Sequence, residues 1–93
     1  MDRSDIITLI ESELILDQEP EINLMRAVIK QAFLDLLVIS DKPKYQRLKI
    51  QAQDWLAGDA KDFELVCTLA LVSSVRIKML YYIVDTCMYS NLS

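Results

Sequence analysis

The chain has 93 residues, of which 53% are hydrophobic and 26% charged, a composition typical of one small globular domain rather than a disordered segment. It contains one Gly, two Pro and no His. These counts exclude a Gly-rich phosphate loop, a Cys₂His₂ zinc finger and every catalytic mechanism that depends on His. We therefore expect no enzyme activity, no metal site, no cofactor and no small-molecule substrate.

The net charge of −4 is unevenly distributed along the chain. Residues 1–40 carry eight acids and three bases, a charge of −5, whereas residues 41–93 carry six acids and seven bases, a charge of +1. Such asymmetry fits a protein that presents its second half to something negative, and it is also within ordinary variation between segments. The first residues lack the pattern of a signal peptide, and no apolar run approaches the roughly 20 residues of a membrane span. The sequence predicts a cytoplasmic protein that makes no membrane contact and keeps its two cysteines reduced.

The first forty residues predict two helices. The first begins after Ser4 as N-cap and runs to about Leu16. The second covers residues 20–39, because Pro20 suits a first helical turn. Its apolar residues form two stripes, Ile22, Met25, Ile29, Phe33 and Leu36 on one side and Leu24, Ala27, Leu34 and Val38 on the other. A helix that is apolar on two sides is expected in the middle of a bundle.

Three further helices are predicted in the second half of the chain. One runs over residues 43–57, and Gly58 after it is expected at the left-handed C-cap position. The next covers residues 60–71 with Asp59 or Asp62 as N-cap, and the last has Ser73 or Ser74 as N-cap and runs to about Tyr89. The inward residues are expected to be Tyr45, Leu48, Ala52, Trp55 and Leu56 in the first of these and Phe63, Val66, Cys67 and Ala70 in the second. The predicted fold is an all-α, five-helix single-domain bundle spanning residues 1–93, in which residues 41–93 form a three-helix unit that resembles a helix-turn-helix.

Residues 66–80 follow the spacing of a helix-turn-helix motif. The matching positions are Val66, Cys67, Ala70, Val72, Ser73, Ile77 and Leu80, with a small residue where two helices cross steeply. Leu71 departs from the motif, which usually has Gly there because the turn requires a positive φ. A leucine at that position costs about 1 kcal/mol or more, unless the turn adopts another geometry.

The last predicted helix has an apolar face and a mixed face. At about 100° per residue, the apolar face consists of Ile77, Leu80, Ile83, Val84, Cys87 and Met88. The candidate binding residues on the mixed face are Ser74, Val75, Lys78, Met79, Tyr82, Asp85 and Tyr89. Tyrosine and methionine are enriched in protein interfaces, so this face predicts a protein partner or, as a homodimer, a second copy.

Duplex DNA is the alternative partner for the same face, since recognition helices present such positions to the major groove. The face carries one cation, Lys78, whereas DNA affinity requires several lysines or arginines. A basic cluster at the start of the third helix supplies possible phosphate contacts; it consists of Lys42, Lys44, Arg47 and Lys49. The other interpretation of this cluster is a solvated first helical turn.

The order of several residue groups resembles a loose group of short, mostly uncharacterised proteins of bacteriophages, prophages and bacterial genomes. The groups are Arg26-Ala27-Val28-Ile29, Gln31-Ala32, Asp35-Leu36, Ala52, Trp55-Leu56, Asp62-Phe63, Val66-Cys67 and Leu69-Ala70. Relatives often have a Gly and then Asp-Pro after the last group, where this chain has Leu71, Val72, Ser73 and Ser74. The resemblance implies an accessory protein of a virus or mobile element inside a bacterial cell, without an established activity.

Four residues have unusual positions for their type. Cys67 and Cys87 lie on apolar faces and are expected to be small buried residues rather than nucleophiles. Arg26 and Arg76 project into apolar faces. For Arg76 we expect a stem on apolar surface with the guanidinium in water, whereas Arg26 fits either this arrangement or a buried pair with Asp35 or Asp62.

Overall fold

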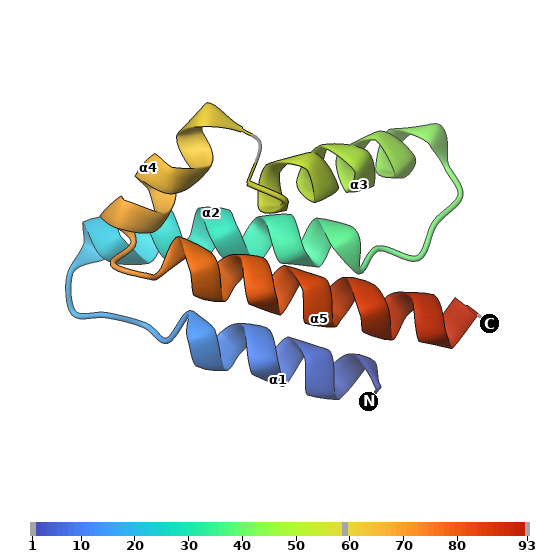
Figure 1. Cartoon of the computed structure of the whole chain (residues 1–93), viewed down its shortest axis with the longest axis horizontal. Coiled ribbons are helices and arrows are strands. Elements are labelled where there is room, and N and C mark those ends of the chain that lie inside the picture. Colours follow the sequence, from blue (N-terminus) through green and yellow to red (C-terminus); the bar gives the residue numbers. More distant parts are fainter. Residues whose placement is uncertain (1, 59, 93) are drawn as a thin grey trace.

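Five α-helices make up the chain in a computed structural model that describes residues 2–58 and 60–92, with side chains described up to residue 88 (Figure 1). The helices are α1 (Arg3–Glu13), α2 (Pro20–Leu36), α3 (Pro43–Leu56), α4 (Lys61–Leu69) and α5 (Ser74–Leu92). No strand occurs in the described residues, so the prediction of an all-α single-domain bundle is confirmed. The same residues contain no helix that is both long and apolar enough to cross a bilayer.

Helix α1 begins earlier and ends earlier than its sequence pattern suggests. Asp2, not Ser4, is the N-cap: its carboxylate accepts from the Asp5 backbone N–H at 3.0 Å, while the Asp5 carboxylate accepts from the Asp2 N–H at 3.2 Å. This reciprocal pair is a capping box with Asp in place of the usual Glu. The helix ends at Glu13 rather than Leu16, and α2 ends at Leu36 rather than residue 39.

The other helix boundaries follow local chemistry. Pro20 and Pro43 occupy the first turns of α2 and α3, and Gly58 has φ 86° after α3, as expected for a left-handed cap. Ala60, without a side-chain bond, is the N-cap of α4; Asp62 lies inside the helix and accepts from Trp55 Nε1 at 2.9 Å instead. Asp59, the other predicted cap, lies outside the described residues.

One buried cluster draws on all five helices. Phe33 of α2 and Phe63 of α4 are its largest fully buried side chains, and Trp55 contacts the Phe63 ring edge-on at 5.1 Å between centroids. The other buried residues are Ile6, Ile10, Leu14, Ile29, Leu36, Leu37, Ala52, Leu56, Cys67, Ala70, Ile77, Leu80 and Val84. Of the inward residues predicted for α3, Ala52 and Leu56 are buried, and Tyr45 and Trp55 are half-buried. The prediction is wrong for Leu48, which is exposed.

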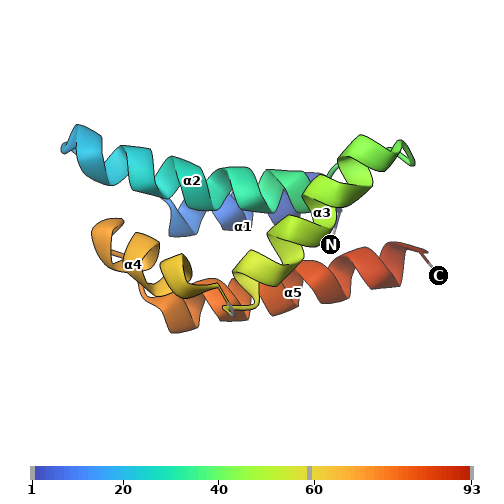
Figure 2. The ribbon, with the colours of Figure 1, turned by 90° about the horizontal axis from the view of Figure 1, so that it is seen from above.

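Helix α2 packs against α1, α3 and α4, while α5 lies alongside α1 (Figures 1 and 2). Ile29, Phe33 and Leu36 of α2 enter the core as predicted. The prediction of a second buried stripe is wrong at Leu24, which is 62% exposed, and at Ala27, whereas Leu34 and Val38 are half-buried. The helices that pack against α2 all contribute to one core cluster. Only the side of α2 that faces this cluster is therefore buried.

Candidate functional site: the outer face of α5

Helix α5 is two-sided, as its sequence pattern predicts. Ile77, Leu80 and Val84 are buried, and Cys87 and Met88 pack partly buried against the core. The prediction is wrong for Ile83, which is 44% exposed. At about 100° per residue Ile83 lies further round the helix than Leu80, beyond the edge of the core contact.

The candidate binding residues of α5 divide into an exposed set and a half-buried set. Val75, Met79 and Tyr82 are exposed at 63%, 58% and 61%. Together with Ile83 they form what we call the outer stripe of α5. Ser74, Lys78 and Asp85 are half-buried beside it. The backbone of Tyr89 belongs to α5, but its side chain lies outside the described residues.

The cation of this face is held against α4. Lys78 Nζ lies 3.9 Å from Glu64 Oε1 and 5.7 Å from the centre of the Phe63 ring. Its aliphatic carbons also pack on Gly58, where a Cβ would lie 2.2 Å from Lys78 Cε. An exposed ion pair of this length contributes little to stability, so packing on Phe63 and Gly58 positions Lys78.

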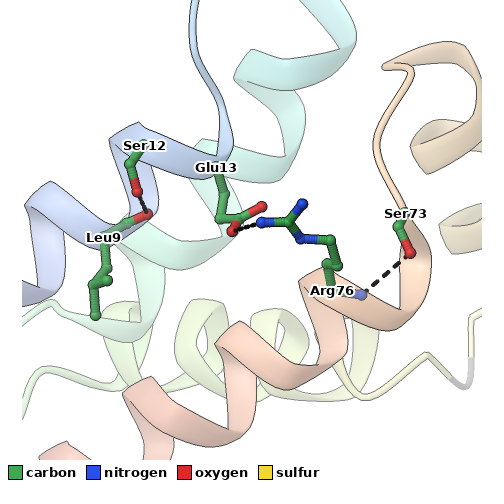
Figure 3. A network of polar contacts seen from close by, with 5 residues as sticks. All are labelled: Leu9, Ser12, Glu13, Ser73 and Arg76. Atoms are coloured by element: carbon green, nitrogen blue, oxygen red, sulfur yellow. Dashed lines mark hydrogen bonds and ion pairs between the residues drawn. The ribbon is translucent and has the colours of Figure 1, made fainter.

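Arg76, two residues before Lys78 on α5, connects this helix to α1. Its Nη2 lies 2.7 Å from Oε1 of Glu13, and its backbone N–H approaches Ser73 Oγ at 3.4 Å (Figure 3). The Arg76 side chain is 68% exposed, which agrees with the expected guanidinium in water. Of the two predicted caps, Ser73 is therefore the N-cap, and α5 begins at Ser74. Both cations at the start of the candidate surface, Arg76 and Lys78, have an acid beside them.

The turn between α4 and α5 is a complete Schellman motif. The N–H of Val72 donates to the Cys67 carbonyl at 3.0 Å, and the N–H of Leu71 donates to the Thr68 carbonyl at 3.2 Å. Leu71 has φ 55°, so the turn takes the left-handed conformation that the sequence pattern assigns to a Gly. The leucine accommodates this geometry at a cost of about 1–2 kcal/mol.

The basic cluster lies far from the start of α5. Lys42, Lys44 and Arg47 are exposed and Lys49 is half-buried, and none of them has an ion-pair partner among the described residues. Lys44 Nζ lies 5.4 Å from the centre of the Tyr45 ring. In both views α3 begins toward one end of the long axis and α5 begins toward the other (Figures 1 and 2). The cluster and Ser74 therefore do not form one continuous surface.

Comparison of this chain with protein-family models, with curated proteins and with solved structures finds no match.

Arg26 has a structural position that its sequence context does not reveal. Its Nε donates to the Ala70 carbonyl at 2.9 Å, and its Nη1 donates to the Ile15 carbonyl. Neither Asp35 nor Asp62 is its partner, so the expected buried pair with an acid is wrong. Instead, one half-buried guanidinium joins α2 to the end of α4 and to the segment after α1. The partners of Arg26 are backbone carbonyls of Ile15 and Ala70. A sequence pattern shows side chains but does not show which backbone carbonyls lack a donor, so these partners could not be predicted.

Cys67 is fully buried, and burial, together with the nearby Glu64 carboxylate, raises the pKa of its thiol from 9.0 to about 11, against an opposing effect of Lys78. A thiol with this pKa is protonated at neutral pH and is a poor nucleophile or metal ligand. Within the described part of the chain, no group of three His, Cys, Asp or Glu residues is arranged to hold a metal ion.

Proposed function

We propose that this chain is a regulatory accessory protein of a phage or mobile element that acts by binding, with the outer stripe of α5 joining two copies. The observation that carries the proposal is the exposure of Val75, Met79 and Tyr82, each more than half exposed on a helix whose opposite face packs against the core. Large apolar side chains that are adjacent on one surface mark an interaction site more often than isolated ones do.

The spacing of the stripe suits a second helix. Val75, Met79, Tyr82 and the exposed Thr86 follow one another at intervals of four, three and four residues. This is the alternation with which one helix presents a continuous seam to another. Ile83 broadens the seam on one side, and α4, which packs against α5, adds the exposed Leu65 and Leu69 to the molecular surface.

Charges beside the stripe favour a second copy as the occupant. Lys78 and Asp85 both flank the seam on the same side and lie seven residues apart. In an antiparallel pair of α5 helices, Lys78 of one copy would add Asp85 of the other to its 3.9 Å contact with Glu64 or exchange one for the other, and the same contact would repeat across the two-fold axis. The outer stripe is thus apolar, and the charges beside it would complement those of a second copy.

DNA binding by the same helix ranks second. Arg76 and Lys78 each have an acid nearby, and Asp85 adds a negative charge to the face. Phosphate contacts would require these cations to leave Glu13 and Glu64. The α4–α5 unit remains a candidate helix-turn-helix on the spacing of its residues and on its left-handed turn.

Light scattering after gel filtration tests the proposal. We expect a dimer at about 100 µM protein and a monomer for Met79→Glu, because a carboxylate in the centre of the seam would lose its water without gaining a partner. Leu24→Glu is the matched control, since Leu24 is 62% exposed on α2 away from the stripe, and it should remain a dimer.

Charge reversal tests the antiparallel arrangement. Lys78→Glu and Asp85→Lys should each weaken the dimer about fivefold or more, and the double variant should restore it. A monomeric parent protein at every concentration would contradict self-association. Fluorescence anisotropy with duplex DNA across a salt series covers the second candidate, and salt-sensitive binding lost in Lys78→Glu would favour DNA instead.

A further inference from the structure

A cavity of about 580 Å³ that is open to solvent on one side lies at the end of the bundle where α3 begins, away from the start of α5. Its walls come from the first turns of α1, the connection between α2 and α3, the first half of α3, and Met88 of α5. Small-molecule sites in proteins have volumes of roughly 300–1,000 Å³ and are formed where several elements meet. The cavity has the size and the location of such a site, and it shares no residue with the outer stripe of α5.

The inner surface of this cavity is apolar. Ile6 and Leu37, 2% and 3% exposed, join it to the hydrophobic core, and Val38, Ile39 and Met88 line it further out. Ile39 is 84% exposed, although it is a large aliphatic side chain next to the cavity. Among the side chains that the structure describes, none that lines the cavity is aromatic, and the described walls are aliphatic. An aliphatic chain suits these walls best.

Two cations stand beside the apolar walls. Arg3 is exposed and Lys49 half-buried, and neither has an ion pair or side-chain hydrogen bond to another described residue. The acid of the lining is Asp41, which is exposed, and the Gln46 amide already donates to the Ser40 carbonyl at 2.7 Å. Lys49 is half-buried as a residue and has no ion-pair partner among the described residues, so an anionic group beside it would give its ammonium a charge-assisted contact.

We infer that this cavity binds a free, single-chain amphiphile with an anionic headgroup, such as a medium-chain carboxylate. The aliphatic tail lies against Ile6, Leu37 and Val38, and the headgroup lies between Arg3 and Lys49. The charge of the two cations selects an anion, and the four surrounding elements select a single molecule rather than a flat lipid surface.

Calorimetric titration with sodium decanoate, below the concentration at which it forms micelles, tests this inference on the full chain. We expect one saturable site, and amide chemical shifts in ¹H–¹⁵N spectra that change at Ile6, Leu37 and Lys49. Decanol, which has the same tail without the charge, should bind at least tenfold more weakly. Lys49→Met and Arg3→Met should each weaken decanoate about tenfold, since each removes one charge-assisted contact and keeps an apolar stem.

Lys61→Met is the control, because Lys61 is exposed at the start of α4 and does not line the cavity. It should bind decanoate like the parent chain. Val38→Phe, which fills part of the cavity, should weaken decanoate and decanol alike while circular dichroism shows an unchanged helix content. The inference would be overturned by an absence of saturable decanoate binding, by decanol binding as tightly as decanoate, or by Lys49→Met and Arg3→Met both keeping the decanoate affinity of the parent chain. So would binding to phosphatidylglycerol vesicles alone, which would indicate a membrane-surface role.

Discussion

Arg26 holds together three segments that are distant in sequence. Its guanidinium donates to the carbonyls of Ile15 and Ala70, and Ala70 is fully buried. A buried carbonyl that loses its donor costs about 1–3 kcal/mol, and donors that carry a charge contribute more than neutral ones. The side chain therefore acts as a structural connection rather than as part of a binding surface.

Arg26→Ala should lower the free energy of unfolding by about 1–3 kcal/mol in urea titrations, because the carbonyl of the buried Ala70 loses its donor, whereas the carbonyl of the exposed Ile15 can accept from water. Arg26→Lys should recover only part of this loss, since one ammonium cannot reproduce the two directions of a guanidinium. Arg47→Ala is the control: Arg47 is exposed and should change stability by less than about 0.5 kcal/mol. Equal stability of the Arg26 and Arg47 variants would contradict the connection.

Leu71 has a positive φ of 55°, which is unusual for a residue other than glycine, and its side chain is 66% exposed. Leu71→Gly should raise the free energy of unfolding by about 0.5–1 kcal/mol, because relief of the left-handed strain exceeds the greater entropy of an unfolded glycine. Leu69→Gly, at an exposed position inside α4, should instead lower it by about 1 kcal/mol. Thermal melts of the two variants should shift in opposite directions, and a shared decrease would contradict strain at Leu71.

The Cys67 thiol makes stability depend on pH in the alkaline range. Its pKa is about 11 in the fold against 9.0 ordinarily, so between these values the folded chain keeps a proton that the unfolded chain has lost. Stability is fully present below pH 9 and should fall by roughly 2–3 kcal/mol as pH rises through 11. Cys67→Ala lacks this contribution but keeps every lysine and tyrosine. The stability difference between the two proteins, measured in urea, should shrink above pH 9; a constant difference would contradict the shift.

At the scale of the helices, the start of α1 tests which acid or hydroxyl caps it. Asp2→Ala should lower the free energy of unfolding by about 0.5–2 kcal/mol, because the capping box with Asp5 is lost. Ser4→Ala should have almost no effect, since Ser4 lies inside the helix. Urea unfolding of both variants distinguishes the two caps, and the reverse order of effects would restore Ser4 as the N-cap.

The helices could be predicted from sequence because their signals are local. Pro20, Pro43 and Gly58 determine boundaries through the backbone of one residue, and the apolar spacing of α5 determines its inner face. The exposure of Leu24 could not be predicted, because it depends on which helix lies opposite it. The same applies to Ile83, at the edge of the α5 contact.

The candidate surfaces were predictable to different degrees. The exposure of Val75, Met79 and Tyr82 follows from helical periodicity, whereas the contact of Lys78 with Phe63 and Glu64 depends on how α4 crosses α5. The cavity beside Lys49 was not predictable, since it brings Arg3 together with residues nearly fifty positions later. Neither a period nor a motif connects such distant segments.

At the scale of the whole molecule, self-association should couple to folding. A dimer that forms only from folded chains is stabilised by mass action, so its melting temperature rises with protein concentration. We expect a higher melting temperature at 500 µM than at 5 µM, by about 5 °C for a chain of this size. Circular dichroism in cells of different path length measures both. Met79→Glu should melt at the same temperature at both concentrations, and a concentration-independent parent protein would contradict the dimer.

Gly58 ends α3 with a left-handed backbone, and it also leaves the space that the carbons of Lys78 occupy. Any side chain at position 58 therefore meets two obstacles, one from its own torsion angle and one from a helix twenty residues further along the chain. In a library of random variants, truncation of Lys78 would remove only the second obstacle. A second substitution that shortens Lys78 should therefore restore stability to Gly58→Asn, because asparagine tolerates a positive φ. It should not restore stability to Gly58→Val or Gly58→Ile, because β-branched residues do not tolerate that φ.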